Sequence, residues 1–180
     1  MAEVAAARPG GAEVVVNVQG DEPFIEEEHV AGAVARVRAG WPVGTVASPV
    51  GTRAAWEDPS VVKVVRNDDG GALYFSRAPI PHLRGRAPEP SELASDAFLR
   101  HIGVYAYTPE ALERWTRLPP GRLERAERLE QLRPLAAGIG IGVAVVGPAA
   151  GGIDTPEDAR RAAERLAREQ DGRTDRDRSE

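Results

Sequence analysis

The sequence predicts an α/β domain, because strand-like and helix-like segments alternate along most of its 180 residues. We expect a mostly parallel or mixed sheet with helices on its flanks. The domain is expected to span 12–169, since 42% of the residues are hydrophobic, enough for a core at this length. The segment 170–180 is expected to be a disordered tail, because QDGRTDRDRSE contains no apolar side chain to pack into a core.

The predicted strands are short and rich in valine. They span 14–18, 45–50, 61–66, 72–76, 98–107 and 139–146. The first reads VVVNV, which is nearly all apolar and typical of a strand covered on both faces. The run NDDGG at 67–71 predicts a hairpin turn between the third and fourth strands.

The predicted helices have apolar residues three or four positions apart. They span 26–38, 109–118, 123–136 and 155–169. In the first, Val30, Ala33, Val34 and Val37 form one apolar stripe, and acidic residues occupy the first turn. The segment 79–91 contains four prolines and predicts an irregular surface loop.

The composition excludes several classes of protein. There is no cysteine, which excludes a disulfide scaffold, a thiolate zinc site and a cysteine nucleophile. The three histidines, at 29, 82 and 101, are too scattered to suggest a histidine metal site. The net charge of −5 argues against binding nucleic acid through charge. Neither a membrane span nor a signal peptide is visible, so we expect a cytoplasmic location.

Two aspartates are candidate metal ligands. Asp21 follows the first predicted strand, and ligands of α/β sheets bind at the carboxyl ends of strands. Asp154, in the segment GGIDTPED, would supply a second carboxylate to the same ion. Two carboxylates combined with phosphate oxygens suit Mg²⁺. The alternatives are local, with Asp21 serving as a turn residue and Asp154 as a helix N-cap.

Other polar residues suggest binding of an anion or a polyhydroxylated ligand. Arg77 ends a predicted strand and can donate two hydrogen bonds to a carboxylate or phosphate, the alternative being an ordinary surface ion pair. His101 and Tyr105 share one strand face, because side chains alternate along a strand. The alternative for this face is a half-buried surface whose polar atoms are satisfied within the protein.

Glu130 and Gln131 lie beside the apolar stripe of the helix predicted over 123–136. They are either ligand-binding residues or a solvated flank of that helix. The sequence contains no nucleophile elbow, phosphate-binding Walker loop or GxGxxG motif. None of the candidate segments is decisive when taken singly.

Taken together, five segments resemble the 3-deoxy-manno-octulosonate cytidylyltransferases, also called CMP-Kdo synthetases. They are VVVNVQGDEPFI, PSVVKVVRNDDGGALYFSRAPIP, FLRHIGVYAYTPEALERW, LERAERLEQLRPLAAG and GGIDTPEDARRA. They occur in the order and at about the spacing of that family, and they cover nearly all of 14–167. The resemblance implies the Rossmann-like fold of nucleotide-diphospho-sugar transferases.

The family transfers CMP from CTP to the acid sugar 3-deoxy-manno-octulosonate (Kdo) and releases pyrophosphate, for lipopolysaccharide synthesis. The resemblance implies that Asp21 and Asp154 hold Mg²⁺, and that Arg77 pairs with the carboxylate of Kdo. It assigns hydrogen bonds to the sugar hydroxyls to five further residues, namely Gln19, His101, Tyr105, Glu130 and Gln131. Family members are usually homodimers, and we expect the contact to involve 79–94.

One departure from the family concerns the start of the chain. Family members begin with a strand and an arginine- and lysine-bearing loop that binds CTP, and no such segment precedes 14–18 here. We expect that Met1 is an internal or wrongly chosen start, and that these 180 residues alone have weak activity or none. Two alternatives are a cytidylyltransferase for another sugar acid or a phosphonate, and a non-catalytic remnant that binds a sugar acid or dimerises.

Overall fold

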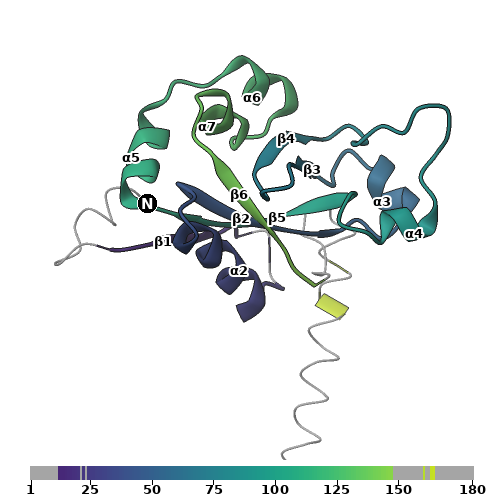
Figure 1. The fold of residues 1–180 in the computed structure, drawn as a ribbon, viewed down its shortest axis with the longest axis horizontal. Coiled ribbons are helices and arrows are strands. Elements are labelled where there is room, and N and C mark those ends of the chain that lie inside the picture. The colour runs from purple at the N-terminus through teal and green to yellow at the C-terminus, as the bar shows by residue number, and fades with distance from the viewer. Residues whose placement is uncertain (1–11, 21, 23, 148–159, 161–162, 165–180) are drawn as a thin grey trace, which may run out of the picture.

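A computed structural model describes residues 12–20, 22, 24–147, 160 and 163–164, which form a mixed six-stranded sheet with flanking helices (Figure 1). The strands are β1 (Val15–Val18), β2 (Val43–Pro49), β3 (Lys63–Arg66), β4 (Ala72–Ser76), β5 (Leu99–Tyr107) and β6 (Ile141–Val145). Their order is β4-β3-β5-β2-β6, and β1 also pairs with β5. The predicted α/β class with a mixed sheet is therefore confirmed.

The expectation of mostly parallel pairing does not hold for the described part of the chain. There, β2 and β6 form a parallel pair, whereas β5 runs antiparallel to β1, β2 and β3. The turn at 67–71 makes β3 and β4 an antiparallel hairpin, as predicted. Alternation of strands and helices along the sequence did not reveal that one long strand, β5, would run against three neighbours.

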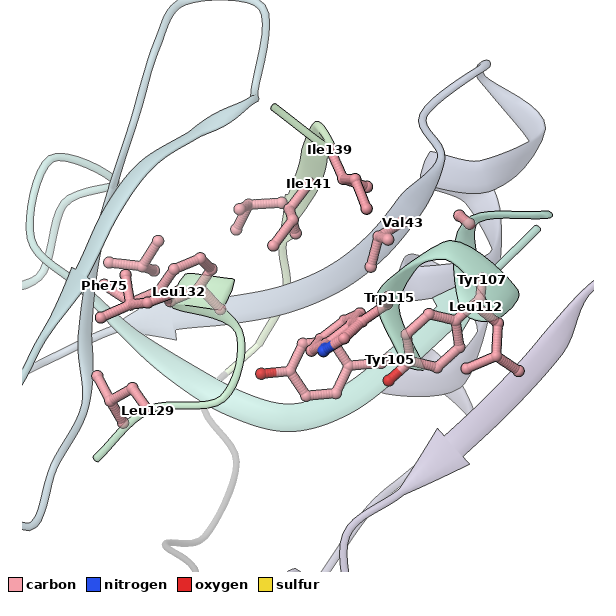
Figure 2. Close-up of a cluster of buried hydrophobic side chains, with 14 of the residues drawn as sticks. Val43, Phe75, Tyr105, Tyr107, Leu112, Trp115, Leu129, Leu132, Ile139 and Ile141 are labelled. Atoms are coloured by element: carbon pink, nitrogen blue, oxygen red, sulfur yellow. The ribbon is translucent and has the colours of Figure 1, made fainter. Parts of the chain in front are cut away.

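Helices cover both faces of the sheet (Figure 1). They are α2 (Glu27–Arg38), α3 (Arg53–Glu57), α4 (Pro90–Leu93), α5 (Pro109–Arg117), α6 (Arg122–Glu127) and α7 (Leu132–Ala136). On one face, Ala33 and Val37 of α2 pack against Val46, Ile102 and Val104. On the other face, α5 and α7 cover a larger core (Figure 2). Apolar residues of β5 therefore face alternate sides, and both sides are buried.

Aromatic rings dominate the larger core. Figure 2 shows Leu112 and Trp115 of α5 against Tyr105 and Tyr107 of β5. The ring centroids of Trp115 lie 5.9 Å from those of Tyr105 and 5.4 Å from those of Tyr107, in edge-on geometry. Such pairs add to the free energy gained from burial alone. This packing fixes α5 against the half of β5 that carries Tyr105.

The prediction of one helix over 123–136 is wrong. The chain forms α6, then leaves helical geometry at Arg128, whose φ of 54° is left-handed, and re-enters a helix at α7. Arg133 of α7 donates from Nε to Glu124 Oε2 of α6 at 2.8 Å, and its Nη2 donates to Glu124 Oε1. This ion pair between the two helices holds the turn. Apolar periodicity continues through the turn, so the sequence pattern did not reveal it.

Two short helices, α3 and α4, were not predicted. Thr52 caps α3 by accepting a hydrogen bond from Ala55 N at 3.2 Å. Trp56 of α3 donates from Nε1 to Ile80 O at 3.1 Å and packs with Leu93 and Phe98. The loop predicted over 79–91 is confirmed up to the start of α4. A small core therefore anchors this loop.

Parts of two predictions lie outside the described residues. Of the helix predicted over 155–169, the described residues 160, 163 and 164 are helical. The predicted tail 170–180 lies outside, so the domain limits of 12–169 stay a prediction. In the described ranges, no helix has the length and apolarity needed to cross a membrane.

Candidate functional site

The turn after β1 is fixed against the middle of β5. Gln19 N donates to Gly103 O at 3.0 Å, and Gly103 N donates to Glu22 Oε1 at 3.1 Å. The Gln19 side chain lies directly over Gly103, where a Cβ would come within 2.3 Å of its Oε1. Glycine at 103 therefore leaves the room that the Gln19 amide occupies. Asp21 lies outside the described residues.

His101 and Tyr105 lie in contact on one face of β5, as the alternation of side chains predicted. Their ring centroids are 5.3 Å apart. The ring of Phe75, from β4, meets His101 edge-on at 5.2 Å. Burial among these rings, with a smaller contribution from the adjacent Arg100, lowers the pKa of His101 from 6.5 to about 3. The imidazole is therefore neutral at pH 7.

A threonine on the neighbouring strand contacts the same imidazole. Thr45 of β2 is fully buried, and its Oγ1 lies 2.9 Å from His101 Nε2. The same hydroxyl donates to Val104 O at 2.7 Å. Thr45 was not singled out from the sequence, because a threonine within an apolar strand is common and carries no signal of its own.

The turn between α6 and α7 carries Glu130 and Gln131. Gln131 is 6% exposed, whereas Glu130 is exposed. Burial raises the pKa values of Tyr105 and Tyr107, and the charge of Glu130 raises both further, which places this carboxylate near the two phenols. For Gln131, the alternative of a solvated helix flank is therefore wrong.

Asn17 of β1 was also missed as a neighbour of this face. It lies opposite Tyr105 in the β1–β5 register, and its side chain hydrogen-bonds the Tyr107 hydroxyl. The signal that would have found it is its position as the polar residue within the apolar run VVVNV.

Arg77, at the end of β4, is held by two backbone carbonyls. Its Nε donates to Glu127 O at 3.0 Å, and its Nη1 donates to Pro59 O at 2.9 Å. The backbone N–H of Arg77 and the hydroxyl of Ser76 donate to the Glu127 carboxylate at 3.0 and 2.7 Å. A guanidinium has five N–H donors, so the two bonds to carbonyls leave others for a ligand.

The structure thus connects five of the described candidates through β5 and the α6–α7 turn, whereas for Gln131 it gives burial alone. Gln19 contacts Gly103, His101 contacts Tyr105, and the charge of Glu130 acts on Tyr105. Arg77 joins this group through Glu127, which lies three residues before Glu130. Glu127 carried no sequence signal, since it reads as one more charged residue of a helix. Asp21 and Asp154 lie outside the described residues, so their convergence on one ion stays a prediction.

The partly buried His101 imidazole predicts a dependence of stability on pH. Because the pKa of His101 is lower in the folded than in the unfolded chain, the unfolded chain takes up a proton first as the pH falls below 6.5. The contribution of the neutral ring to the free energy of unfolding is therefore fully present above pH 6.5. It is lost progressively as the pH falls towards 3. Between pH 6.5 and 4.5 this loss should be about 2 kcal/mol.

The His101→Gln variant should lack this part of the pH dependence, which urea denaturation at a series of pH values would measure. His82 is exposed on the loop before α4 and provides the control, since His82→Gln should behave like the unmodified chain. The prediction would be contradicted if the free energy of unfolding fell equally steeply with pH in the unmodified chain and in His101→Gln.

Comparison with known proteins gives one consistent result. Residues 1–141 match the cytidylyltransferase family. The chain is 52% identical over 151 residues to the 3-deoxy-manno-octulosonate cytidylyltransferase of Gemmatimonas aurantiaca, an alignment that covers 83% of this chain and 57% of the relative. The protein of the same name from Xanthomonas campestris pv. campestris is 50% identical over 158 residues, covering 85% and 63% respectively. The chain thus spans between 57% and 63% of the length of these relatives.

The fold agrees with this result. A solved structure of CMP:2-keto-3-deoxy-manno-octonic acid synthetase complexed with CTP superimposes with a TM-score of 0.79 and 36% sequence identity. The superposition covers 93% of this chain and 66% of that chain. Since the family match extends over most of the sequence, the chain belongs to the cytidylyltransferase family.

Proposed function

We propose that this chain forms the sugar-acid-binding and metal-binding part of an enzyme that transfers CMP from CTP to Kdo. The observation that carries the proposal is the β5 face, where the rings of His101 and Tyr105 lie in contact. The charge of Glu130, in the α6–α7 turn, raises the pKa of Tyr105 on the same face. Such a group of hydrogen-bonding side chains beside aromatic rings suits a polyhydroxylated ligand. The names of the relatives from Gemmatimonas aurantiaca and Xanthomonas campestris support Kdo as the acceptor.

In the proposed reaction, the anomeric hydroxyl of Kdo attacks the α-phosphorus of CTP. A new bond forms between the sugar oxygen and the α-phosphorus, and the hydroxyl proton is released. The bond from the α-phosphorus to the bridging oxygen breaks, and pyrophosphate leaves with that oxygen. Little covalent chemistry is required of the protein, so its task is to hold the two reactants in line. We assign the sugar hydroxyls to five residues, namely Gln19, His101, Tyr105, Glu130 and Gln131. The remaining N–H groups of Arg77 would bind the carboxylate.

Mg²⁺ is the proposed cofactor, and Asp21 and Asp154 would hold it. Their carboxylates are hard oxygen donors, and one or two of them with phosphate oxygens is the set that Mg²⁺ prefers. When bound, the ion would neutralise charge on the triphosphate. Within the described ranges, no three histidine or carboxylate side chains gather into a metal site, so the proposal depends on these two aspartates. A cytoplasmic location and a homodimer formed through 79–94 are further parts of the proposal.

Calorimetric titration with Kdo tests the proposal on the chain as it stands. We expect Kdo to bind and a neutral hexose not to bind, because the site is assigned to a carboxylate as well as to hydroxyls. Glu130→Gln should weaken Kdo binding about tenfold, since a charged acceptor becomes a neutral one. Glu57→Gln is the matched control, because Glu57 is an exposed carboxylate on α3, paired with Arg53, and should leave binding unchanged.

The rival acceptors are distinguished in the same titration. Binding of another sugar acid or of a phosphonate, without binding of Kdo, would contradict the assignment of the acceptor. Binding of Kdo that is equally weakened by Glu130→Gln and by Glu57→Gln would contradict the assignment of the site.

A further inference from the structure

We propose that Thr45 is a positioning residue that fixes the His101 ring as its Nε2–H tautomer and thereby presents Nδ1 as a hydrogen-bond acceptor for the substrate. The tautomer follows from the described contacts alone. The step to the substrate rests on the proposed function, and the two can fail separately.

The first step of the argument concerns the single hydrogen of the Thr45 hydroxyl. Oγ1 donates to Val104 O at 2.7 Å and lies 2.9 Å from His101 Nε2. A hydroxyl has one hydrogen and two lone pairs. Since its hydrogen is directed to Val104, Oγ1 can only accept from the imidazole, and Nε2 must carry the proton.

The second step explains why the hydroxyl does not turn round. Thr45 and Val104 are both fully buried. They lie at an irregularity in the β2–β5 ladder, where Thr45 is opposite Tyr105 but the next residue, Val46, is opposite Ile102. If the hydroxyl hydrogen turned to His101, the buried carbonyl of Val104 would lose this donor, which costs free energy. The interruption of the ladder therefore determines the direction of the hydroxyl.

The third step concerns the charge of the ring. Phe75 and Tyr105 lie against His101, and Arg100 is the adjacent cation. Burial and the Arg100 charge both favour the neutral form, in agreement with the lowered pKa of His101. A neutral imidazole with its proton on Nε2 has a lone pair on Nδ1. A protonated ring would donate from both nitrogens and offer no acceptor.

The polarity of the ring determines what the ligand must supply here, namely a hydrogen-bond donor. A sugar hydroxyl is such a donor, so the hydroxyls of the proposed acceptor suit Nδ1. Thr45 acts through His101 and does not itself touch the ligand, which is why we describe it as a positioning residue. In the opposite tautomer Nδ1 would carry the proton and would donate to an acceptor group of the ligand.

Nitrogen-15 NMR of the imidazole tests the tautomer without any ligand. Long-range proton–nitrogen spectra of the labelled chain at pH 7 should show His101 Nε2 as the protonated nitrogen and Nδ1 as the unprotonated one. Thr45→Ser, which keeps the hydroxyl, should retain this pattern. Thr45→Val, which removes the hydroxyl at nearly constant shape, should give a mixture of tautomers. An Nδ1–H tautomer in the unmodified chain, or an unchanged spectrum in Thr45→Val, would overturn the inference.

Kdo titration supplies the second readout. Thr45→Val should weaken Kdo binding about tenfold and Thr45→Ser by no more than about threefold. Thr116→Val is the matched control, because Thr116 lies on the exposed surface of α5, where its hydroxyl donates to Glu113 O. If Kdo does not bind the unmodified chain while the Nε2–H tautomer is found, the proposed function fails and the assignment of the tautomer stands. If Thr45→Val unfolds, the spectrum of the unmodified chain still tests the tautomer. The titration of Thr45→Ser with Kdo still tests the effect on the substrate.

Discussion

Lys63→Met is expected to lower the free energy of unfolding by about 3 kcal/mol or more. Lys63 is the single lysine of the sequence and is fully buried. Its Nζ donates to the carbonyl oxygens of Asp58, Val61 and Arg77 at 2.7, 2.5 and 2.6 Å. Burial lowers the pKa of this amine from 10.5 to about 8, so it remains an ammonium at pH 7, with three N–H groups for three acceptors.

Methionine would fill a similar volume but would leave three carbonyls without this donor. Because Arg77 O is one of them, the variant should also loosen the strand end that carries the candidate carboxylate-binding guanidinium. Urea denaturation at pH 7 measures the effect. Arg53→Met removes an exposed cation, paired with Glu57, and should change stability by no more than about 0.5 kcal/mol. A decrease in the free energy of unfolding of less than about 1 kcal/mol for Lys63→Met would contradict the prediction. It would show that water replaces the amine as the donor to the three carbonyls.

Gly44→Ala should be comparably destabilising, by about 3 kcal/mol, for a steric reason. A Cβ at position 44 would lie 2.0 Å from the backbone oxygen of Ala33 in α2. It would also lie 3.0 Å from Arg36 Cβ. No rotamer change relieves a contact with backbone, so α2 would have to move away from β2 and open the core formed with Val46 and Ile102.

Gly20→Ala is the matched control for this substitution, since no atom of the described residues, apart from the chain neighbours of Gly20, lies within 4 Å of the added Cβ. It should alter the unfolding midpoint little, whereas Gly44→Ala should lower it in both thermal and urea denaturation. Similar midpoints for the two variants would mean that α2 packs on β2 less closely than described.

The local elements were largely predictable from the sequence, because each has a signal of its own. Alternating and continuous runs of valine identified the strands, the NDDGG turn identified the β3–β4 hairpin, and the stripe from Val30 to Val37 identified α2. The break between α6 and α7 was missed because it depends on Arg128 in a left-handed conformation and on the Glu124–Arg133 ion pair. Neither feature changes the spacing of apolar residues along the sequence.

The candidate site was predictable only in part. The shared face of His101 and Tyr105 follows from the two-residue period of a strand. Their neighbours Thr45 and Phe75 come from β2 and β4, far away in the chain, and only strand pairing brings them to the imidazole. The same is true of Glu127 and Arg77, which are 50 residues apart.

The sequence by itself determined the α/β class, most of the elements and the family resemblance, because these depend on residue types and spacings along the chain. The tertiary structure alone decided the antiparallel course of β5, the direction of the Thr45 hydroxyl and the burial of Lys63. Each of these depends on which groups from distant segments compete for the same hydrogen-bond partner or the same space. That competition arises only when the chain is folded, and no local pattern encodes its outcome.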